Sequence, residues 1–549
     1  MIMTFIDAVK FLESYIPSSE KKHPGELGLA RMQYLMDLLG NPQITYPTIH
    51  VGGTSGKGST ATIIASILAT KYKVGLHTSP HLEKITERIK ILEPKLFSSF
   101  WQARNERAQN RFWTSQNDIK IDITDDDFIS LTNQIFPTIK IVEKSKFGRP
   151  SYFEIVSAMA FLYFQKQKVD FAVVEVGMGG RYDATNVIKP LVAVLTKVGL
   201  DHTEVLGDTV EKIAKDKVGI IKPHINVVSG VRQHSIIKIV EDKCRLEQAA
   251  LSLLMIPSPR GSPNMRATPE VSLSHFGYQV KMLTQEGSVF DYINMGRINN
   301  LKLSLLGEYQ VENAALAIRA IEKLSNQLII KSTNQLIKLG EEDIRKGLLS
   351  VFIPGRLEIV KKNPLVILDG AHNPEKMKAL VKAISDIFPN KKITAILAIK
   401  SEKNARAMLL LLLPICKCVV LTKFRLTTDL GDTYSYDPEE LLEIVKSRHP
   451  EFIPPKRDPV QPAVISGSSK DWIPDPFGFA QGRQVRDDNN VLIQPKSCMI
   501  VEKPIEALRI AQLISNSDDL ILVTGSLYLV GEIRKRFSNY SNYHSNVHE

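Results

Sequence analysis

The 549-residue sequence is poor in the features that would place it in a membrane or in an oxidising compartment. No apolar run reaches the ~18 residues that a membrane-spanning helix requires. Its four cysteines have the spacing of neither a metal site nor a disulfide framework; they are Cys244, Cys416, Cys418 and Cys498. The first residues carry an acid within their apolar stretch and lack a small-residue cleavage site. We therefore expect a cytoplasmic protein with reduced thiols, no signal peptide and no membrane contact.

Acidic residues are fewer than basic ones, 59 against 70. The resulting formal net charge of +11, with a pI near 9.2, would suit a polyanionic partner. No basic run is interleaved with aromatic residues, as an extended nucleic-acid surface would favour. A solvated surface combined with a site for anionic small molecules accounts for the same charge. We therefore expect small-molecule partners, a monomer and no nucleic acid, with a nucleic-acid-binding ATPase as the alternative.

The length exceeds what one hydrophobic core usually holds, so it indicates more than one domain. Short β-branched runs alternate with helical patterns, which predicts an α/β fold with largely parallel sheets. In the first part we expect a helix over 59–72 and strands at 48–51, 74–78, 171–176, 191–197 and 226–230. After the break at Ile353-Pro354-Gly355, a second series predicts strands at 365–369, 393–399, 418–424 and 520–525.

These patterns predict two domains. Residues 1–352 would form a P-loop ATPase domain with a mostly parallel sheet, and residues 353–549 a smaller, Rossmann-like, doubly wound domain. Three segments have the composition of additions to this plan, at 93–120, 256–272 and 454–490. We expect them to be peripheral, and the last to be disordered.

A glycine-rich loop between an expected strand and an expected helix is the strongest local signal. Its sequence is Gly52-Gly53-Thr54-Ser55-Gly56-Lys57-Gly58-Ser59. Glycines allow backbone N–H groups to converge on phosphate oxygens, and a helix N-terminus adds a positive dipole end. Lys57 would reach the β- and γ-phosphates of ATP, and the Ser59 hydroxyl would ligate Mg²⁺. The alternative is an ordinary glycine-rich turn.

Polar residues also follow the carboxyl ends of three further strands, the edge at which parallel sheets gather ligands. Glu175 ends the apolar run FAVVE, so it either binds a cation or forms a buried salt bridge. Ser79 follows another strand, where its hydroxyl would join Ser59 and Glu175 around Mg²⁺, although serine before proline is also common in plain turns. His202 follows a third strand and is either a ligand or structural.

Taken in order, the motifs resemble the folylpolyglutamate synthase/dihydrofolate synthase family of the Mur ligase superfamily. The motifs are VGGTSGKGS, TSPHLEKITERI, SYFEIVSAMA, VVEVGMGGRYDATN, GLDHTEVLGDT, KDKVGIIK, GEYQVENAALA, PGRLE, DGAHNP and VTGSLYLVGEIR. They cover most of the chain, and the three additions lie between them.

The resemblance implies roles for named residues. ATP would be held by Gly53, Thr54, Ser55, Gly56, Lys57, Gly58, Ser59, Asn313, Arg356 and Asp369. Two Mg²⁺ sites would use Ser59, Ser79 and Glu175 in one and His202 with Lys217 in the other, Lys217 being a carbamate. Tyr182, Asp183, Ala184 and Thr185 would contribute to the folate pocket. The catalytic residues would be Lys57, His202, Lys217 and His372, with His372 positioning glutamate or an acyl phosphate.

The activity that the resemblance implies is ATP-dependent addition of L-glutamate to a folate or to dihydropteroate. ATP would convert the acceptor carboxylate into an acyl phosphate, which the glutamate amine then attacks. A Mur-type ligase acting on a cell-wall nucleotide precursor would use the same chemistry and is the second alternative. The GRYDAT segment argues against a pocket for a uridine diphosphate sugar.

Overall fold

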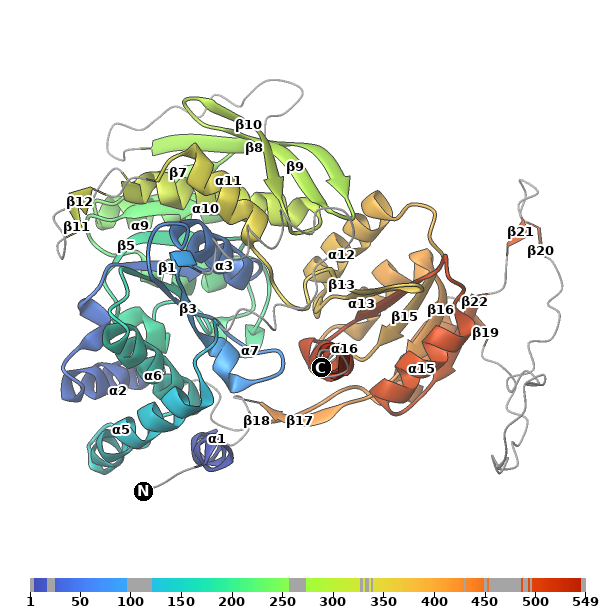
Figure 1. Cartoon of the computed structure of the whole chain (residues 1–549), viewed down its shortest axis with the longest axis horizontal. Coiled ribbons are helices and arrows are strands. Elements are labelled where there is room, and N and C mark those ends of the chain that lie inside the picture. Colours follow the sequence, from blue (N-terminus) through green and yellow to red (C-terminus); the bar gives the residue numbers. More distant parts are fainter. Residues whose placement is uncertain are drawn as a thin grey trace. The chain divides into compact units, whose positions relative to one another are not determined.

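The structure is a computed structural model that describes residues 4–16, 25–95, 121–255, 273–325, 339–428, 431–448 and 496–544, with two-residue strands at 329–330, 335–336, 452–453, 485–486 and 492–493. Residues 96–120, 256–272 and most of 454–490 lie outside this range, so the expectations for the three additions fall largely on residues that are not described. The chain divides into two compact units, one of residues 1–354 with 427–432 and one of residues 355–426 with 433–549. Each unit contains a large sheet of its own (Figure 1).

The first unit is built on a ten-stranded sheet with the order β10-β9-β8-β7-β6-β5-β1-β4-β2-β3. Its strands are β1 (Thr48–Gly52), β2 (Val74–His77), β3 (Ile89–Leu92), β4 (Phe171–Glu175), β5 (Pro190–Leu195), β6 (Asn226–Ser229), β7 (Ala250–Leu254), β8 (Leu273–Thr284), β9 (Gly287–Ile293) and β10 (Arg297–Leu303). The seven neighbouring strands β8, β7, β6, β5, β1, β4 and β2 pair in parallel. At one end of the sheet β3 is antiparallel to β2, and at the other end β9 and β10 are antiparallel to their neighbours.

Alternation along β4 determines where its last side chain points. Phe171 and Val173 belong to the core on one face of the sheet, whereas Ala172 and Val174 belong to the core on the other face. Because side chains alternate with a period of two, Glu175 shares the face of Phe171 and Val173. That face is covered by the helix that follows the glycine-rich loop, so the carboxylate emerges at the beginning of this helix.

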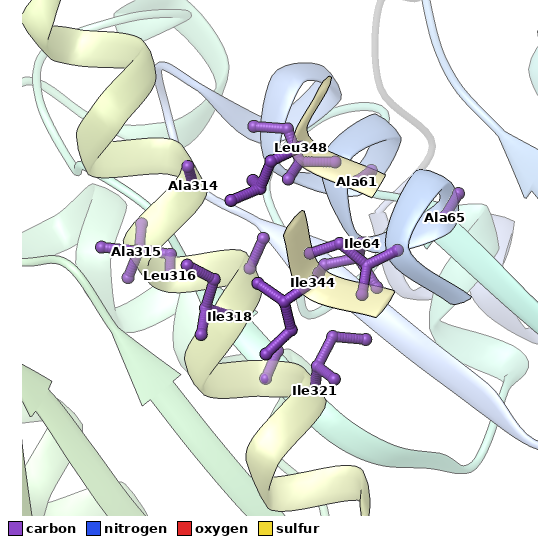
Figure 2. Close-up of a cluster of buried hydrophobic side chains, with 14 of the residues drawn as sticks. Ala61, Ile64, Ala65, Ala314, Ala315, Leu316, Ile318, Ile321, Ile344 and Leu348 are labelled. Carbon is purple, nitrogen blue, oxygen red and sulfur yellow. The ribbon is translucent and has the colours of Figure 1, made fainter. Parts of the chain in front are cut away.

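Helices cover both faces of the sheet. The described helices of this unit are α1 (Phe5–Glu13), α2 (Gly25–Leu38), α3 (Lys57–Leu68), α5 (Asp125–Lys144), α6 (Tyr152–Lys166), α7 (Thr203–Leu206), α8 (Val210–Lys217), α9 (His234–Leu246), α10 (Glu308–Ser325) and α11 (Glu341–Ser350). Helices α3, α10 and α11 pack together on one face, with Ile64 of α3, Ile318 of α10 and Ile344 of α11 in a shared buried cluster (Figure 2). Helices α1, α2, α5 and α6 form the layer on the opposite face.

The second unit contains a seven-stranded sheet with the order β13-β14-β23-β15-β16-β22-β19. Its elements are β13 (Glu358–Lys362), β14 (Leu365–Leu368), α12 (Pro374–Ile387), β15 (Ile393–Leu397), α13 (Ala405–Leu412), β16 (Cys416–Leu421), α14 (Pro438–Arg448), β19 (Phe452–Ile453), β22 (Lys496–Ile500), α15 (Pro504–Ile514), β23 (Leu520–Thr524) and α16 (Leu527–His544). Within this sheet, β13 pairs with β14 in antiparallel orientation, and the other neighbouring strands pair in parallel. Six short strands form three separate two-stranded sheets. β17 (Arg425–Thr428) pairs with β18 (Gly431–Tyr434), and β20 (Val485–Arg486) pairs with β21 (Leu492–Ile493). In the first unit, β11 (Ile329–Ile330) pairs with β12 (Gln335–Leu336).

The predicted α/β class, with a mostly parallel sheet and a second sheet domain, is confirmed. All four cysteines are buried and free. Among the described helices, none is both long and apolar enough to cross a membrane.

Candidate active site

The glycine-rich loop joins β1 to the first turn of α3. Gly53 has φ 140° and Gly56, the N-cap of α3, has φ 90°, two conformations that side chains with a Cβ rarely adopt. The Thr54 N–H donates to the Lys197 carbonyl at 2.7 Å, and the Thr54 hydroxyl bonds both backbone groups of Gly199 at 3.1 Å. The loop is therefore fixed to the segment after β5, with the N-terminus of α3 available to an anion.

Asn313 of α10 packs against this loop. A Cβ on Gly56 would collide with Asn313 Oδ1, so only glycine permits the contact. Asn313 is buried, and its Nδ2 donates to Gln310 Oε1 at 3.0 Å. Asn313 therefore belongs to the same compact unit as the phosphate loop and lies directly beside it.

The structure brings Glu175, Ser79 and the first turn of α3 together. Glu175 lies beside Val51 in the parallel register of β4 and β1, and its Oε2 accepts a hydrogen bond from the Ser79 N–H at 2.9 Å. A Cβ on Gly58 would stand 3.2 Å from Glu175 Oε2, which places the carboxylate against the turn that carries Ser59. The Glu175 side chain is 5% exposed, so its charge is largely removed from water.

These donors fit a magnesium ion. Mg²⁺ prefers hard oxygen ligands and is usually bound by one or two carboxylates together with phosphate oxygens. Glu175 would supply the carboxylate, and Ser59 and Ser79 would supply hydroxyls. Within the described residues, no group of three His, Cys, Asp or Glu side chains could hold a metal. A cation at this edge would therefore need the hydroxyls and the oxygens of a bound phosphate.

Lys217, the last residue of α8, is a buried lysine close to Lys57. Burial, together with the positive charge of Lys57, lowers the pKa of Lys217 to about 7, against the opposing charges of Asp216 and Asp201. The GMGG turn packs on its backbone, since a Cβ on Gly180 would stand 2.7 Å from the Lys217 carbonyl oxygen. A lysine amine with this pKa is substantially neutral at physiological pH, which makes it a nucleophile.

His202 lies on the loop after β5, at the N-cap of the short helix α7, with φ 51°. Its Nδ1 is 4.0 Å from Glu204 Oε1, and its side chain is about one-third exposed. It neighbours Asp201, whose charge acts on Lys217. The loop that carries His202 therefore lies near enough to Lys217 for the charge of Asp201 to act on it.

The GRYDAT segment is held by a buried hydrogen-bond chain. Asp183 accepts hydrogen bonds from the Met178 N–H at 2.8 Å and from the N–H and hydroxyl of Thr185. The Thr185 hydroxyl is 2.8 Å from Nε2 of His50, a buried ring on β1 whose pKa burial lowers to about 3. Ala184 is also buried, and Tyr182 is half-buried. Of the four predicted folate-pocket residues, Tyr182 therefore presents the most side chain to solvent.

Three predicted residues belong to the second unit. Asp369 is buried after β14, accepts hydrogen bonds from the N–H groups of Leu357 and Ala371 at 2.9 Å, and has a pKa raised by burial. Arg356 acts electrostatically on Asp369 and opposes that rise. His372 Nδ1 bonds the Gly370 carbonyl at 2.7 Å, and its Nε2 is 2.8 Å from Lys376 Nζ at the start of α12.

A buried charged group that the sequence motifs did not predict supports the phosphate loop. Glu312 on α10 is buried, and its Oε2 pairs with Lys197 Nζ at 3.0 Å and with Arg232 at 2.6 Å. Lys197 is the residue whose carbonyl accepts the Thr54 N–H. The available signal was a glutamate inside the otherwise apolar helix pattern VENAALA, next to the predicted Asn313.

The comparisons with known proteins agree with this geometry. The Mur ligase middle domain matches residues 128–321, and the Mur ligase glutamate ligase domain matches residues 355–473. The chain is 31% identical to a dihydrofolate synthase/folylpolyglutamate synthase of Bacillus subtilis, over 93% of this chain and 94% of the relative. It is similar to Mycobacterium tuberculosis folylpolyglutamate synthase complexed with ADP, with a TM-score of 0.72, 25% identity and coverage of 97% and 99% of the two chains. It is also similar to an FPGS–AMPPCP–folate complex, with a TM-score of 0.65, 27% identity and the same coverage.

The fold and the phosphate-loop edge, taken with these matches, define a ligase of the Mur type. The motifs predicted the narrower group, and that prediction is confirmed. The chain belongs to the folylpolyglutamate synthase/dihydrofolate synthase family.

Proposed function

We propose that the chain uses ATP to join L-glutamate to the carboxylate of a folate, with dihydropteroate as a second acceptor. The observation that carries the proposal is the meeting of the glycine-rich loop, Ser79 and the Glu175 carboxylate at one sheet edge. The relatives support the choice of acceptor, because the Bacillus subtilis protein is named for both activities.

ATP is the nucleotide, and the solved relatives that hold ADP or AMPPCP support this assignment. Residues 53–59 would hold its phosphates, with Lys57 at the β- and γ-phosphates. Asn313, which packs on Gly56, would contact the nucleotide in the first unit. We also assign Arg356 and Asp369 to the nucleotide and His372 to glutamate; these three residues belong to the second unit.

Two Mg²⁺ ions would accompany ATP, one held by Ser59, Ser79 and Glu175 and one by His202 and Lys217. When bound, such ions neutralise negative charge on the phosphoryl oxygens and orient the acceptor carboxylate. Lys217 becomes an oxygen ligand only as a carbamate. Its neutral amine would attack CO₂, forming an N–C bond and releasing one proton, which converts the neutral amine into an anionic carbamate with oxygen donors.

The chain's residues otherwise position and shield the reactants. Lys57 would stabilise charge on the transferred phosphoryl group while the acceptor carboxylate displaces ADP to give an acyl phosphate. His372, held by the Gly370 carbonyl and Lys376, would orient the glutamate whose amine then displaces phosphate. Tyr182 would contact the folate, on a loop fixed by Asp183 and Thr185.

An assay with radiolabelled glutamate tests the proposal. The full chain is incubated with ATP and Mg²⁺, separately with tetrahydrofolate and with dihydropteroate. We expect glutamate incorporation with at least one acceptor, loss of incorporation without Mg²⁺, and loss in Lys57→Ala. A folded chain that binds ATP but incorporates glutamate with neither acceptor would refute the folate assignment. Stimulation of ATP hydrolysis by DNA or RNA would favour the nucleic-acid alternative instead.

A further inference from the structure

The turn that carries Arg356 has an unusual backbone. Gly355 has φ 66° and Leu357 has φ 46°, so both residues flanking Arg356 are in the left-handed region, where a non-glycine residue such as Leu357 is strained. A strained turn persists only when surrounding contacts determine it. The contacts that do so therefore also determine where the Arg356 side chain points.

Two buried carboxylates hold this turn through its N–H groups. Asp369 accepts the Leu357 N–H at 2.9 Å, and Glu358 accepts the Gly355 N–H at 2.8 Å. The Gly355 carbonyl also accepts the Gly370 N–H at 2.9 Å. Asp369 and Arg356 are already assigned to the nucleotide, whereas Glu358 has no assigned role.

Glu358 is oriented from α16. Arg534 Nε lies 3.0 Å from Glu358 Oε1 and 2.9 Å from Oε2, and the two side chains are 16% and 7% exposed. A buried carboxylate needs a partner to remain charged and fixed. Without Arg534, we expect the Glu358 carboxylate to rotate toward solvent and release the Gly355 N–H.

We propose that Arg534 is a positioning residue for ATP binding: through Glu358 it fixes the strained turn that presents Arg356. This inference rests on the proposed contact between Arg356 and the nucleotide. Arg534 would act through two hydrogen bonds within the second unit, its own to Glu358 and that of the Gly355 N–H to Glu358.

The test compares steady-state kinetics of Arg534→Met, Arg534→Lys and Glu358→Gln in the full chain. We expect Arg534→Met to raise the KM for ATP about tenfold while kcat stays within about twofold, because ground-state positioning of the nucleotide is lost. Arg534→Lys should recover part of the affinity, since lysine keeps a positive charge beside Glu358. Lys535→Met is the matched control, an exposed cation on the same helix, and should leave the KM unchanged.

A double-mutant cycle separates positioning from general damage. Arg534→Met should add little to the KM of Arg356→Ala, since the two changes remove one interaction. Additive effects, or an unchanged KM for ATP in folded Arg534→Met, would overturn the inference. If Arg534→Met does not fold, Glu358→Gln gives the same readout, a raised KM for ATP. An unchanged KM in Arg356→Ala alone would instead overturn the nucleotide role proposed for Arg356.

Discussion

Glu175 and Gly58 are in such close contact that a methyl group on Gly58 would stand 3.2 Å from Glu175 Oε2 and 3.4 Å from Oε1. The carboxylate cannot move freely to make room, because the Ser79 N–H holds the same Oε2 at 2.9 Å. The absence of a side chain at Gly58 thus serves the position of a charge on another strand. Glycine at position 58 is therefore needed for the placement of the Glu175 carboxylate, and not for the formation of helix α3.

Gly58→Ala should lower activity without lowering stability. Gly58 lies in the first turn of α3, and alanine there favours the helix by up to about 1 kcal/mol. The added methyl group displaces the Glu175 carboxylate, so we expect the kcat/KM for ATP to fall about tenfold or more. Steady-state kinetics and thermal unfolding measure the two effects. Gly296→Ala is the control, since a methyl group there meets nothing within 4 Å; equal losses of stability and activity in Gly58→Ala would contradict the separation.

Lys217 should respond to CO₂. Its pKa of about 7 leaves much of the amine neutral at pH 7.5, whereas an exposed lysine would be almost fully protonated. Lys217→Ala should abolish activity, and millimolar acetate should restore part of it by supplying a carboxylate. Bicarbonate should activate wild-type protein prepared under CO₂-free conditions, more strongly at pH 8 than at pH 6. Full activity of Lys217→Ala without acetate would show that no carbamate is required.

The sequence predicted β1, β2, β4, β5 and β6 of the first sheet and β14, β15, β16 and β23 of the second to within one or two residues at most ends, because their apolar runs are buried. Helix α3 begins at Lys57 instead of the expected 59, since Gly56 at φ 90° ends the loop and caps the helix. The hairpins of β8, β9 and β10 were not predicted. Buried and exposed residues are mixed along β8 and β10, such as Tyr278 beside Gln279, which differs from the continuous apolar pattern of parallel strands.

Some contacts of the candidate site could likewise be predicted from the sequence, and others could not. The proximity of Ser79 and Glu175 was predictable, since parallel strands bring their carboxyl ends to one edge. The contact of Asn313 with Gly56 depends on how α10 packs on α3, which no local pattern encodes. The same holds for Arg534, whose partner Glu358 lies far away in the sequence.

The buried pair of Arg31 and Glu154 gives a test of the first unit's helical layer. Arg31 Nε and its NH2 group donate to the two oxygens of Glu154 at 2.7 and 2.8 Å, with side chains 8% and 3% exposed. Arg31→Met leaves a buried carboxylate without this partner, so we expect a loss of about 3–5 kcal/mol of unfolding free energy. Urea unfolding measures it. Adding Glu154→Gln should recover a large part of the loss, and an effect of Arg31→Met below about 1 kcal/mol would mean that the pair is dispensable.

Acid should destabilise the first unit through two buried histidines that are not assigned to the reaction. Burial lowers the pKa of His77 to about 4 and that of His50 to about 3. The unfolded chain binds a proton at each histidine below about pH 6.5, whereas the folded chain does so only near these lower values. The contribution of these histidines to the unfolding free energy is therefore fully present above about pH 6.5. It is lost as the pH falls toward 4, by about 1.4 kcal/mol per pH unit for each histidine.

His77→Gln isolates one of these contributions, because glutamine can replace the hydrogen bonds to the Arg88 carbonyl and the Ser157 hydroxyl without binding a proton. Its unfolding free energy, measured in urea between pH 7 and 5, should fall less steeply than that of the wild type, by about 1.4 kcal/mol per unit in the lower half of this range. His234→Gln, at an exposed position, should keep the wild-type slope. If His77→Gln also keeps that slope, then His77 is protonated in the folded chain, and the acid sensitivity must come from other groups.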